Sequence, residues 1–147
     1  MFVGRYEHTL DEKKRVALPA RFRNLVEHGV VITRGPDHCL WILPRDKWEQ
    51  IAAKLDSAIN LAGKDSRLLT RLFFSGAVDE MPDNQRRVRI PDYLLKYAGI
   101  DSDVIIVGMN SRLEIWSRER WLEQEAYIEE HPEEISEHFA SMATLNI

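Results

Sequence analysis

Apolar and polar positions alternate at the start of the chain, and this period of two predicts a β-strand over residues 2–10. A second short strand is predicted over 15–18, after a polar turn. Over 19–28 the spacing changes, because apolar residues recur at i, i+3 and i+4 as on one face of a helix. Gly29 is a typical residue for the end of that helix.

Two buried strands follow over 30–33 and 39–43, and the Gly-Pro pair between them predicts a turn. We expect a helix from Pro44, a loop over 60–64 and a further helix capped by Asp65. The same order then returns in the second half, with strands over 77–81, 87–90, 103–107 and 113–116 and helices over 91–98, 118–130 and 133–142.

One nine-residue stretch occurs twice, at Asp11–Pro19 and at Asp83–Pro91. Both copies read Asp, two polar residues, two adjacent cations, Val, any residue, an aliphatic residue and Pro. A fixed offset of 72 residues indicates one supersecondary unit used twice. Each copy places a cationic turn directly before a short strand.

The repeat predicts an α+β fold of two β-β-α-β-β modules with added helices after each module. We expect the first module over 5–47, connecting helices over 48–75, the second module over 76–119 and an acidic helical tail over 120–147.

The charge of the chain is unevenly distributed. The formal net charge is −4, but residues 121–147 carry seven Glu and no Lys or Arg, which leaves +3 on residues 1–120. Binding to a polyanion depends on the local field rather than on the total charge, so the total does not exclude nucleic acid as a partner.

Other classes of function find little support in the sequence. It contains no phosphate-binding glycine loop, nucleophile elbow or metal-ligand spacing, so we expect no enzyme, no cofactor, no metal site and no small-molecule substrate. The single Cys39 fits a reducing compartment, and no apolar run approaches the ~18 residues of a membrane helix. We therefore expect a cytoplasmic protein without a membrane partner.

Several motifs resemble those of the MraZ family of bacterial transcriptional regulators, which contain two tandem SpoVT/AbrB-type modules. The resemblance covers nearly the whole chain. It rests on the opening Met-Phe-x-Gly, on Asp11, Lys13, Arg15, Pro19 and Arg23, on Thr33-Arg34-Gly35, on Phe73-Phe74-Ser75-Gly76-Ala77 and on Leu113-Glu114-Ile115-Trp116.

The resemblance implies a swapped-hairpin, AbrB-like β-barrel whose subunits assemble into rings. It also implies a repressor-like regulator that binds double-stranded DNA in the nucleoid. Its targets would be short G-rich direct repeats upstream of its own operon of cell-division and cell-wall genes.

By position, the resemblance places the DNA contacts on Lys13, Lys14, Arg15, Arg86 and Arg87. The two arginines that end the turns suit guanine, because a guanidinium donates to both O6 and N7. The other three cations suit phosphates, which position a protein without specifying sequence. The alternative is a solvated basic hairpin tip. For Arg21, Arg23 and Arg89 a surface salt bridge is an equal alternative.

The sequence departs from the family at two positions, because Lys14 and Arg86 stand where glycine is usual. Glycine there indicates a positive φ or a close approach of another backbone. A long cation in the left-handed region would cost on the order of 1 kcal/mol. Either these turns adopt another geometry or they accept this strain.

The acidic tail allows three interpretations: a solvated segment, a segment packed on a neighbouring subunit through Ile135 and Phe139, and a docking element for a protein partner or a competitor for the basic turns. The last supports an alternative function, that of an antitoxin-like interaction module.

Overall fold

The computed structural model describes residues 1–58 and 63–142 of the 147-residue chain. It divides into two compact units, Met1–Ser117 and the segment from Arg118 onward. Residues 60–62 of the expected loop lie outside the described part. None of the described helices is both long enough and apolar enough to cross a membrane.

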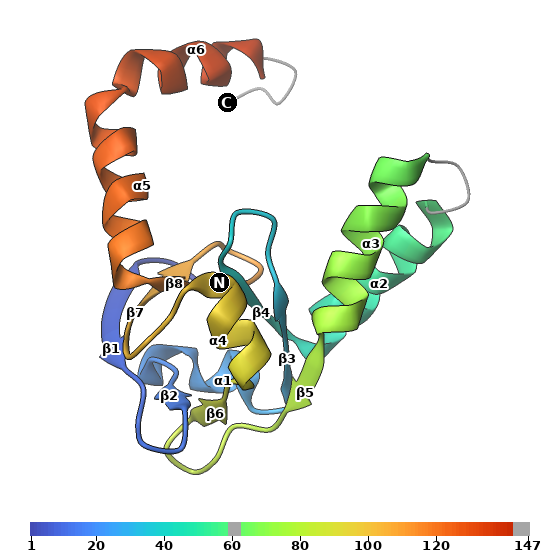
Figure 1. The fold of residues 1–147 in the computed structure, drawn as a ribbon, viewed down its shortest axis with the longest axis vertical. Coiled ribbons are helices and arrows are strands. Elements are labelled where there is room, and N and C mark those ends of the chain that lie inside the picture. Colours follow the sequence, from blue (N-terminus) through green and yellow to red (C-terminus); the bar gives the residue numbers. More distant parts are fainter. Residues whose placement is uncertain (59–62, 143–147) are drawn as a thin grey trace. The chain divides into compact units, whose positions relative to one another are not determined.

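The first unit is α+β and holds two antiparallel sheets (Figure 1). Six strands are hydrogen-bonded in the order β1-β7-β8-β4-β3-β5, and β2 pairs with β6 in a separate ribbon. The strands are β1 Arg5–Thr9, β2 Arg15–Ala17, β3 Val30–Arg34, β4 Leu40–Pro44, β5 Val78–Glu80, β6 Arg87–Arg89, β7 Asp103–Gly108 and β8 Leu113–Ser117.

The two halves of the sequence exchange strands. β1 from the first half pairs with β7 from the second, and β5 from the second half pairs with β3 from the first. The strand order is therefore unchanged when the halves are interchanged, as two copies of one unit require. The described strands form two sheets and do not close into a single barrel, which corrects that part of the expected fold.

The helices are η1 Ala20–Phe22, α1 Arg23–Val26, α2 Arg45–Ala58, α3 Lys64–Gly76, α4 Asp92–Ala98, α5 Arg118–Glu130 and α6 Pro132–Ser141. The helix expected over 19–28 is instead a short 3-10 turn followed by the four-residue α1. The expected cap at Asp65 is also wrong, since α3 begins at Lys64 after Gly63 and has no side-chain cap.

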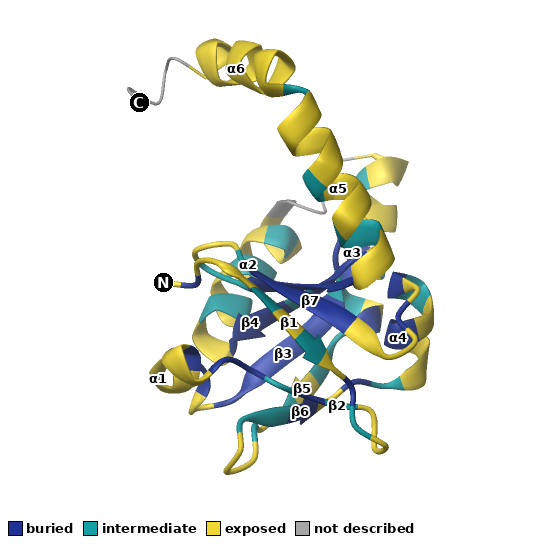
Figure 2. Cartoon of the chain, turned by 90° about the vertical axis from the view of Figure 1, so that its left-hand side faces the viewer, coloured by how far each residue is buried: buried dark blue, intermediate teal, exposed yellow. Residues whose placement is uncertain are grey.

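The hydrophobic core is shared by both halves and lies against the inner face of the β2–β6 ribbon (Figure 2). Val16 and Leu18 from the first half and Val88 and Ile90 from the second are at most 1% exposed. Alternate residues of a strand point to opposite faces, so burial of these four directs their neighbours in the ribbon outward. The core thus fixes which side chains the ribbon presents to solvent.

Two of the sequence motifs contact each other in the structure. Thr33 Oγ1 donates a hydrogen bond to the carbonyl of Phe73, and Arg34 Nε donates to the carbonyl of Leu72 at 3.0 Å. These two bonds attach the end of β3 to the C-terminal part of α3. A Cβ at Gly76 would lie 2.7 Å from Arg34 Nε, so a side chain there would displace Arg34.

The second unit contains α5 and α6. The two helices meet at His131, where the following Pro132 occupies the first turn of α6. Apolar side chains on α6 are exposed, among them Phe139 at 54%. Within the described residues this unit therefore presents an acidic surface with an apolar stripe.

Candidate nucleic-acid interface

The two repeated segments lie together in the β2–β6 ribbon. Its register pairs Arg15 with Arg89, Val16 with Val88 and Ala17 with Arg87. Two further backbone bonds of 2.9 Å extend it, from Leu18 N to the Arg86 carbonyl and from Ile90 N to the Lys14 carbonyl. Because the strands are antiparallel, the two cationic turns stand at opposite ends of a ribbon of three residue pairs.

An aspartate organises each turn. In the first, Asp11 Oδ1 accepts hydrogen bonds from the backbone N–H groups of Lys13 and Arg15, both at 2.9 Å. In the second, Asp83 Oδ1 accepts from the N–H groups of Gln85 at 2.9 Å and Arg87 at 2.8 Å. The same pattern in both copies confirms that the repeat is one structural unit, and it explains why each copy begins with Asp.

The same carboxylates hold the two arginines. Arg15 Nε donates to Asp11 Oδ2 at 2.8 Å, and Arg87 Nε donates to Asp83 Oδ2 at 2.7 Å. Each guanidinium also has its Nη1 4.0 Å from the carboxylate of the other turn. Four charged groups from the two halves therefore form one network on the outer face of the ribbon.

The turns adopt the left-handed geometry. Lys14 has φ of 61° and Arg86 has φ of 60°, so both accept the backbone strain that glycine would avoid. Arg86 has a partial compensation, because its Nε donates to the carbonyl of Leu18 at 3.0 Å. Of the two alternatives left open by the sequence, the structure supports strain.

Hydrogen bonding lowers the pKa of both aspartates below the ordinary value. The largest cause at Asp11 is the bond from the backbone N–H of Arg15, and at Asp83 it is the bond from the backbone N–H of Arg87. The guanidinium of the same arginine lowers each pKa further. Both carboxylates are therefore charged at neutral pH, and each partly neutralises its arginine.

The structure brings the five predicted contact residues onto one surface, although the sequence placed them in separate modules. Lys13 and Lys14 are exposed, and Arg15, Arg86 and Arg87 are half-buried. Their role in binding DNA stays a prediction.

The contacts of the two aspartates with Arg15 and Arg87 were missed at the sequence level. The signal was present, because Asp stands four residues before Arg in both copies.

Arg21 has a structural explanation. Its Nη1 lies 3.1 Å from the hydroxyl of Tyr6, and its guanidinium lies 5.6 Å from the centre of the Phe22 ring. This favours the structural alternative for Arg21 over contact with DNA.

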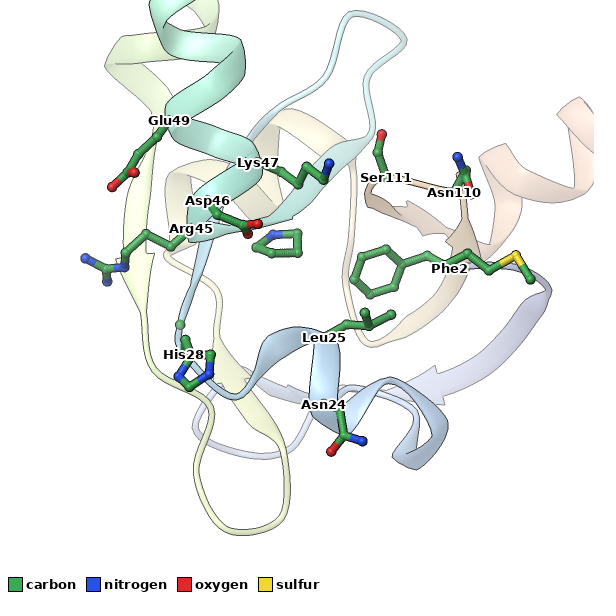
Figure 3. Close-up of a pocket in the computed structure, with 13 residues that line it drawn as sticks. Phe2, Asn24, Leu25, His28, Arg45, Asp46, Lys47, Glu49, Asn110 and Ser111 are labelled. Carbon is green, nitrogen blue, oxygen red and sulfur yellow. The ribbon is translucent and has the colours of Figure 1, made fainter.

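A separate cleft of about 690 Å³ shares no residue with the two turns. It lies between the N-terminus, α1, the start of α2 and the turn that follows β7, with Phe2 and Leu25 facing Asp46 and Lys47 (Figure 3). Among the described residues, no group of three or more His, Cys, Asp or Glu is placed to hold a metal ion. The two turns are the candidate site because they carry the repeated cationic motif.

Comparison with known proteins agrees with this organisation. A family described as "MraZ protein, putative antitoxin-like" matches residues 1–72 and again residues 73–145. The chain belongs to the MraZ family. Each of the two matched stretches contains one cationic turn, so the family repeat coincides with the structural one.

Curated MraZ relatives cover most of the chain. "Transcriptional regulator MraZ" of Syntrophomonas wolfei is 42% identical over 97% of this chain and 99% of its own length. Proteins with the same description from Carboxydothermus hydrogenoformans and Caldanaerobacter subterraneus are 45% and 44% identical, over 82% and 94% of this chain and 84% and 96% of their own lengths. The MraZ family is one of transcriptional regulators and not of enzymes.

The depressed pKa values of the turn aspartates predict a pH-dependent stability. Asp11→Asn removes the carboxylate whose negative charge is stabilised by the bonds from Arg15. We therefore expect a lower free energy of unfolding than in the wild type at pH 7. The stabilisation is fully present above the unfolded pKa of about 3.8 and disappears as the pH falls through the lower folded pKa. Chemical denaturation from pH 7 to pH 2.5 measures the difference.

Glu12→Gln is the matched control, because it removes an exposed carboxylate of the same turn whose side chain accepts none of the turn's hydrogen bonds. Its stability should follow the wild type at each pH. A difference between Asp11→Asn and wild type that stays constant down to pH 2.5 would show that the carboxylate charge does not stabilise the turn.

Proposed function

We propose that the chain is a sequence-specific, repressor-like DNA-binding regulator that contacts double-stranded DNA through the two turns of the β2–β6 ribbon. The observation that supports this most is the shared surface itself. Residues 11–19 and 83–91 together hold six cations and three carboxylates, in a protein whose total charge is −4. A local positive surface of this kind attracts the phosphate backbone.

The ribbon has dimensions that suit the major groove. A two-stranded β-ribbon fits into this groove, which is about 12 Å wide. Three residue pairs span roughly 7 Å from first to last. In this arrangement Arg15 and Arg87, oriented by their aspartates, present their remaining N–H groups to guanine. Lys13, Lys14 and Arg86 lie at the turns, where they contact phosphates.

Asp11 and Asp83 do not argue against this role. Each is committed to an arginine and to the backbone of its own turn, so neither presents an unpaired charge to the phosphates. Fixed geometry of this kind also lowers the entropy that the arginines lose on binding.

The remaining parts of the proposal follow the family. The targets are G-rich direct repeats upstream of the chain's own operon of division and cell-wall genes. The protein itself lies in the cytoplasm, associated with the nucleoid. We also infer that the exchange of β1 and β5 between the halves corresponds to the strand exchange of a swapped-hairpin fold. The modules are taken as 5–47 and 76–119, with connecting helices over 48–75 and a tail over 120–147.

Assembly into a ring would strengthen a weak site. One ribbon makes few contacts, but a ring presents several ribbons to several direct repeats. The second contact is then intramolecular, and its effective concentration raises the overall affinity without any new interaction.

The strained lysine offers a test that separates charge from turn geometry. Lys14→Gly keeps the positive φ and removes one cation, so we expect unchanged or higher stability, by up to about 1 kcal/mol. Binding to a short duplex with G-rich direct repeats should weaken several-fold. The slope of log affinity against log salt should fall by about 0.9, the loss of one phosphate contact. Fluorescence anisotropy over a salt series measures both.

Asn110→Gly is the matched control, because Asn110 has the same backbone conformation, with φ of 63°, but no charge and no place in the ribbon. It should bind DNA as the wild type does. If Lys14→Gly bound with the wild-type salt slope, the first turn would not contact phosphate.

A second candidate is an antitoxin-like interaction module, which the description of the matched family favours. The structure adds one observation: Ile135 and Phe139 on α6 and Met142 directly after it are exposed at the i, i+4, i+7 spacing of one helix face. The seven glutamates of residues 121–147 would attract a small basic protein.

Phe139→Ser tests this second candidate. It should abolish co-purification of a small basic protein from the native host and leave DNA binding unchanged. Leu68→Ser, at a leucine of α3 that is 51% exposed, is the control and should retain the partner. Equal co-purification with both variants would show that Phe139 does not contribute to binding a partner.

A further inference from the structure

The outer face of the β2–β6 ribbon is not symmetric between the two halves. The residue of the first half that corresponds to Arg89 is Ala17, at the offset of 72 residues. The register therefore pairs Arg15 with Arg89 at one end of the ribbon and Arg87 with Ala17 at the other. One end has two arginines across the strands, and the other has one.

Arg89 differs from the other arginines of the ribbon in its surroundings. It is exposed, and its side chain has no hydrogen-bond or ion-pair partner in the part of the chain that the structure describes. Arg15 is bound by Asp11 and directed toward Asp83, and Arg87 is bound by Asp83 and directed toward Asp11. A surface salt bridge, the alternative that the sequence left open for Arg89, is absent among these residues.

The position of Arg89 is unfavourable in the free protein. Side chains directly opposite each other on one face of an antiparallel pair lie close together, and like charges there are destabilising. The carboxylate of Asp11 pairs with Arg15 and weakens this repulsion, but no carboxylate among the described residues pairs with Arg89. An acceptor from outside the chain would relieve this repulsion.

The register also assigns Arg89 to one turn. The residue that follows it, Ile90, donates its N–H to the carbonyl of Lys14, so Arg89 stands next to the first turn although it belongs to the second repeat. That end of the ribbon presents four cations, Lys13, Lys14, Arg15 and Arg89, whereas the other end presents Arg86 and Arg87. Arg89 lies on a strand of the ribbon, opposite Arg15, and a ribbon that enters the major groove presents such outward side chains to base edges.

We propose that Arg89 is a specificity-determining residue that donates to the O6 and N7 acceptors of a guanine and makes the two ends of the ribbon read different sequences. This inference rests on the proposed DNA-binding function. It predicts that one subunit recognises an asymmetric site, which suits direct repeats rather than a palindrome. A palindrome would be expected if the two ends were equivalent.

The test uses the full chain and a pool of duplexes with a randomised centre. Wild-type protein selects its preferred sequence from the pool, and the affinity ratio between that sequence and random DNA is then measured for each variant. Arg89→Gln should reduce this ratio by about 5- to 100-fold, the range expected for loss of one bidentate contact to guanine. Its affinity for random DNA should change by a few-fold at most.

Two further variants separate base contact from charge. Arg89→Lys keeps the charge but loses the bidentate geometry, so it should restore affinity for random DNA and not the ratio. Lys54→Gln removes an exposed cation of α2 outside the ribbon and should leave the ratio unchanged. Ala17→Arg supplies the missing arginine and should make the selected sequence more symmetric.

The outcomes distinguish this inference from the function on which it rests. If the wild type selects a sequence and Arg89→Gln has the same ratio, or Arg89→Lys restores it in full, Arg89 contacts phosphate only and the inference is wrong. If the wild type selects no sequence at all, the proposed function itself is wrong. Thermal melting of each variant confirms that it is folded.

Discussion

The candidate interface depends on two carboxylates that hold two arginines. Asp11 and Asp83 each accept two backbone bonds and one guanidinium bond, and each lies near the arginine of the other turn. These bonds add to the backbone hydrogen bonds of each turn and help to offset the strain of the positive φ at Lys14 and Arg86. The network holds Arg15 and Arg87 in place, whereas unpaired arginines on a surface would be mobile.

The exchange of strands between the halves provides the support for this network. β1 and β5 each pair with a strand of the other half, so neither half buries its apolar face alone. The shared core then covers the inner face of the ribbon through Val16 and Val88. A ribbon of three residue pairs would be marginal by itself, and its attachment to this core makes it rigid enough to present charges in a defined geometry.

Much of this organisation is predictable from the sequence, because it is local. The nine-residue repeat, the positions of the strands and the cationic turns follow from periodicity and turn chemistry. The helix expected over 19–28 is shorter because the apolar pattern alone does not specify where helical hydrogen bonding begins and ends, and here α1 stops at Val26.

The pairing of β2 with β6 was not predictable, because it joins residues about 72 positions apart and no local signal specifies it. The position of Arg89 beside the first turn, and the approach of each aspartate to the arginine of the other turn, depend on that pairing. The sequence could place the five cations in turns, but only the structure shows that the turns share one surface and that the second repeat contributes an arginine beside the first turn.

The central claim is that both turns of one subunit form a single DNA-binding surface. Hydrogen exchange measured by mass spectrometry, with and without a duplex carrying G-rich direct repeats, tests it most directly. The account predicts that DNA slows exchange in peptides covering 11–19 and 83–91 together, with little change over 118–142. Slower exchange in only one of the two turns, or in neither, would contradict it.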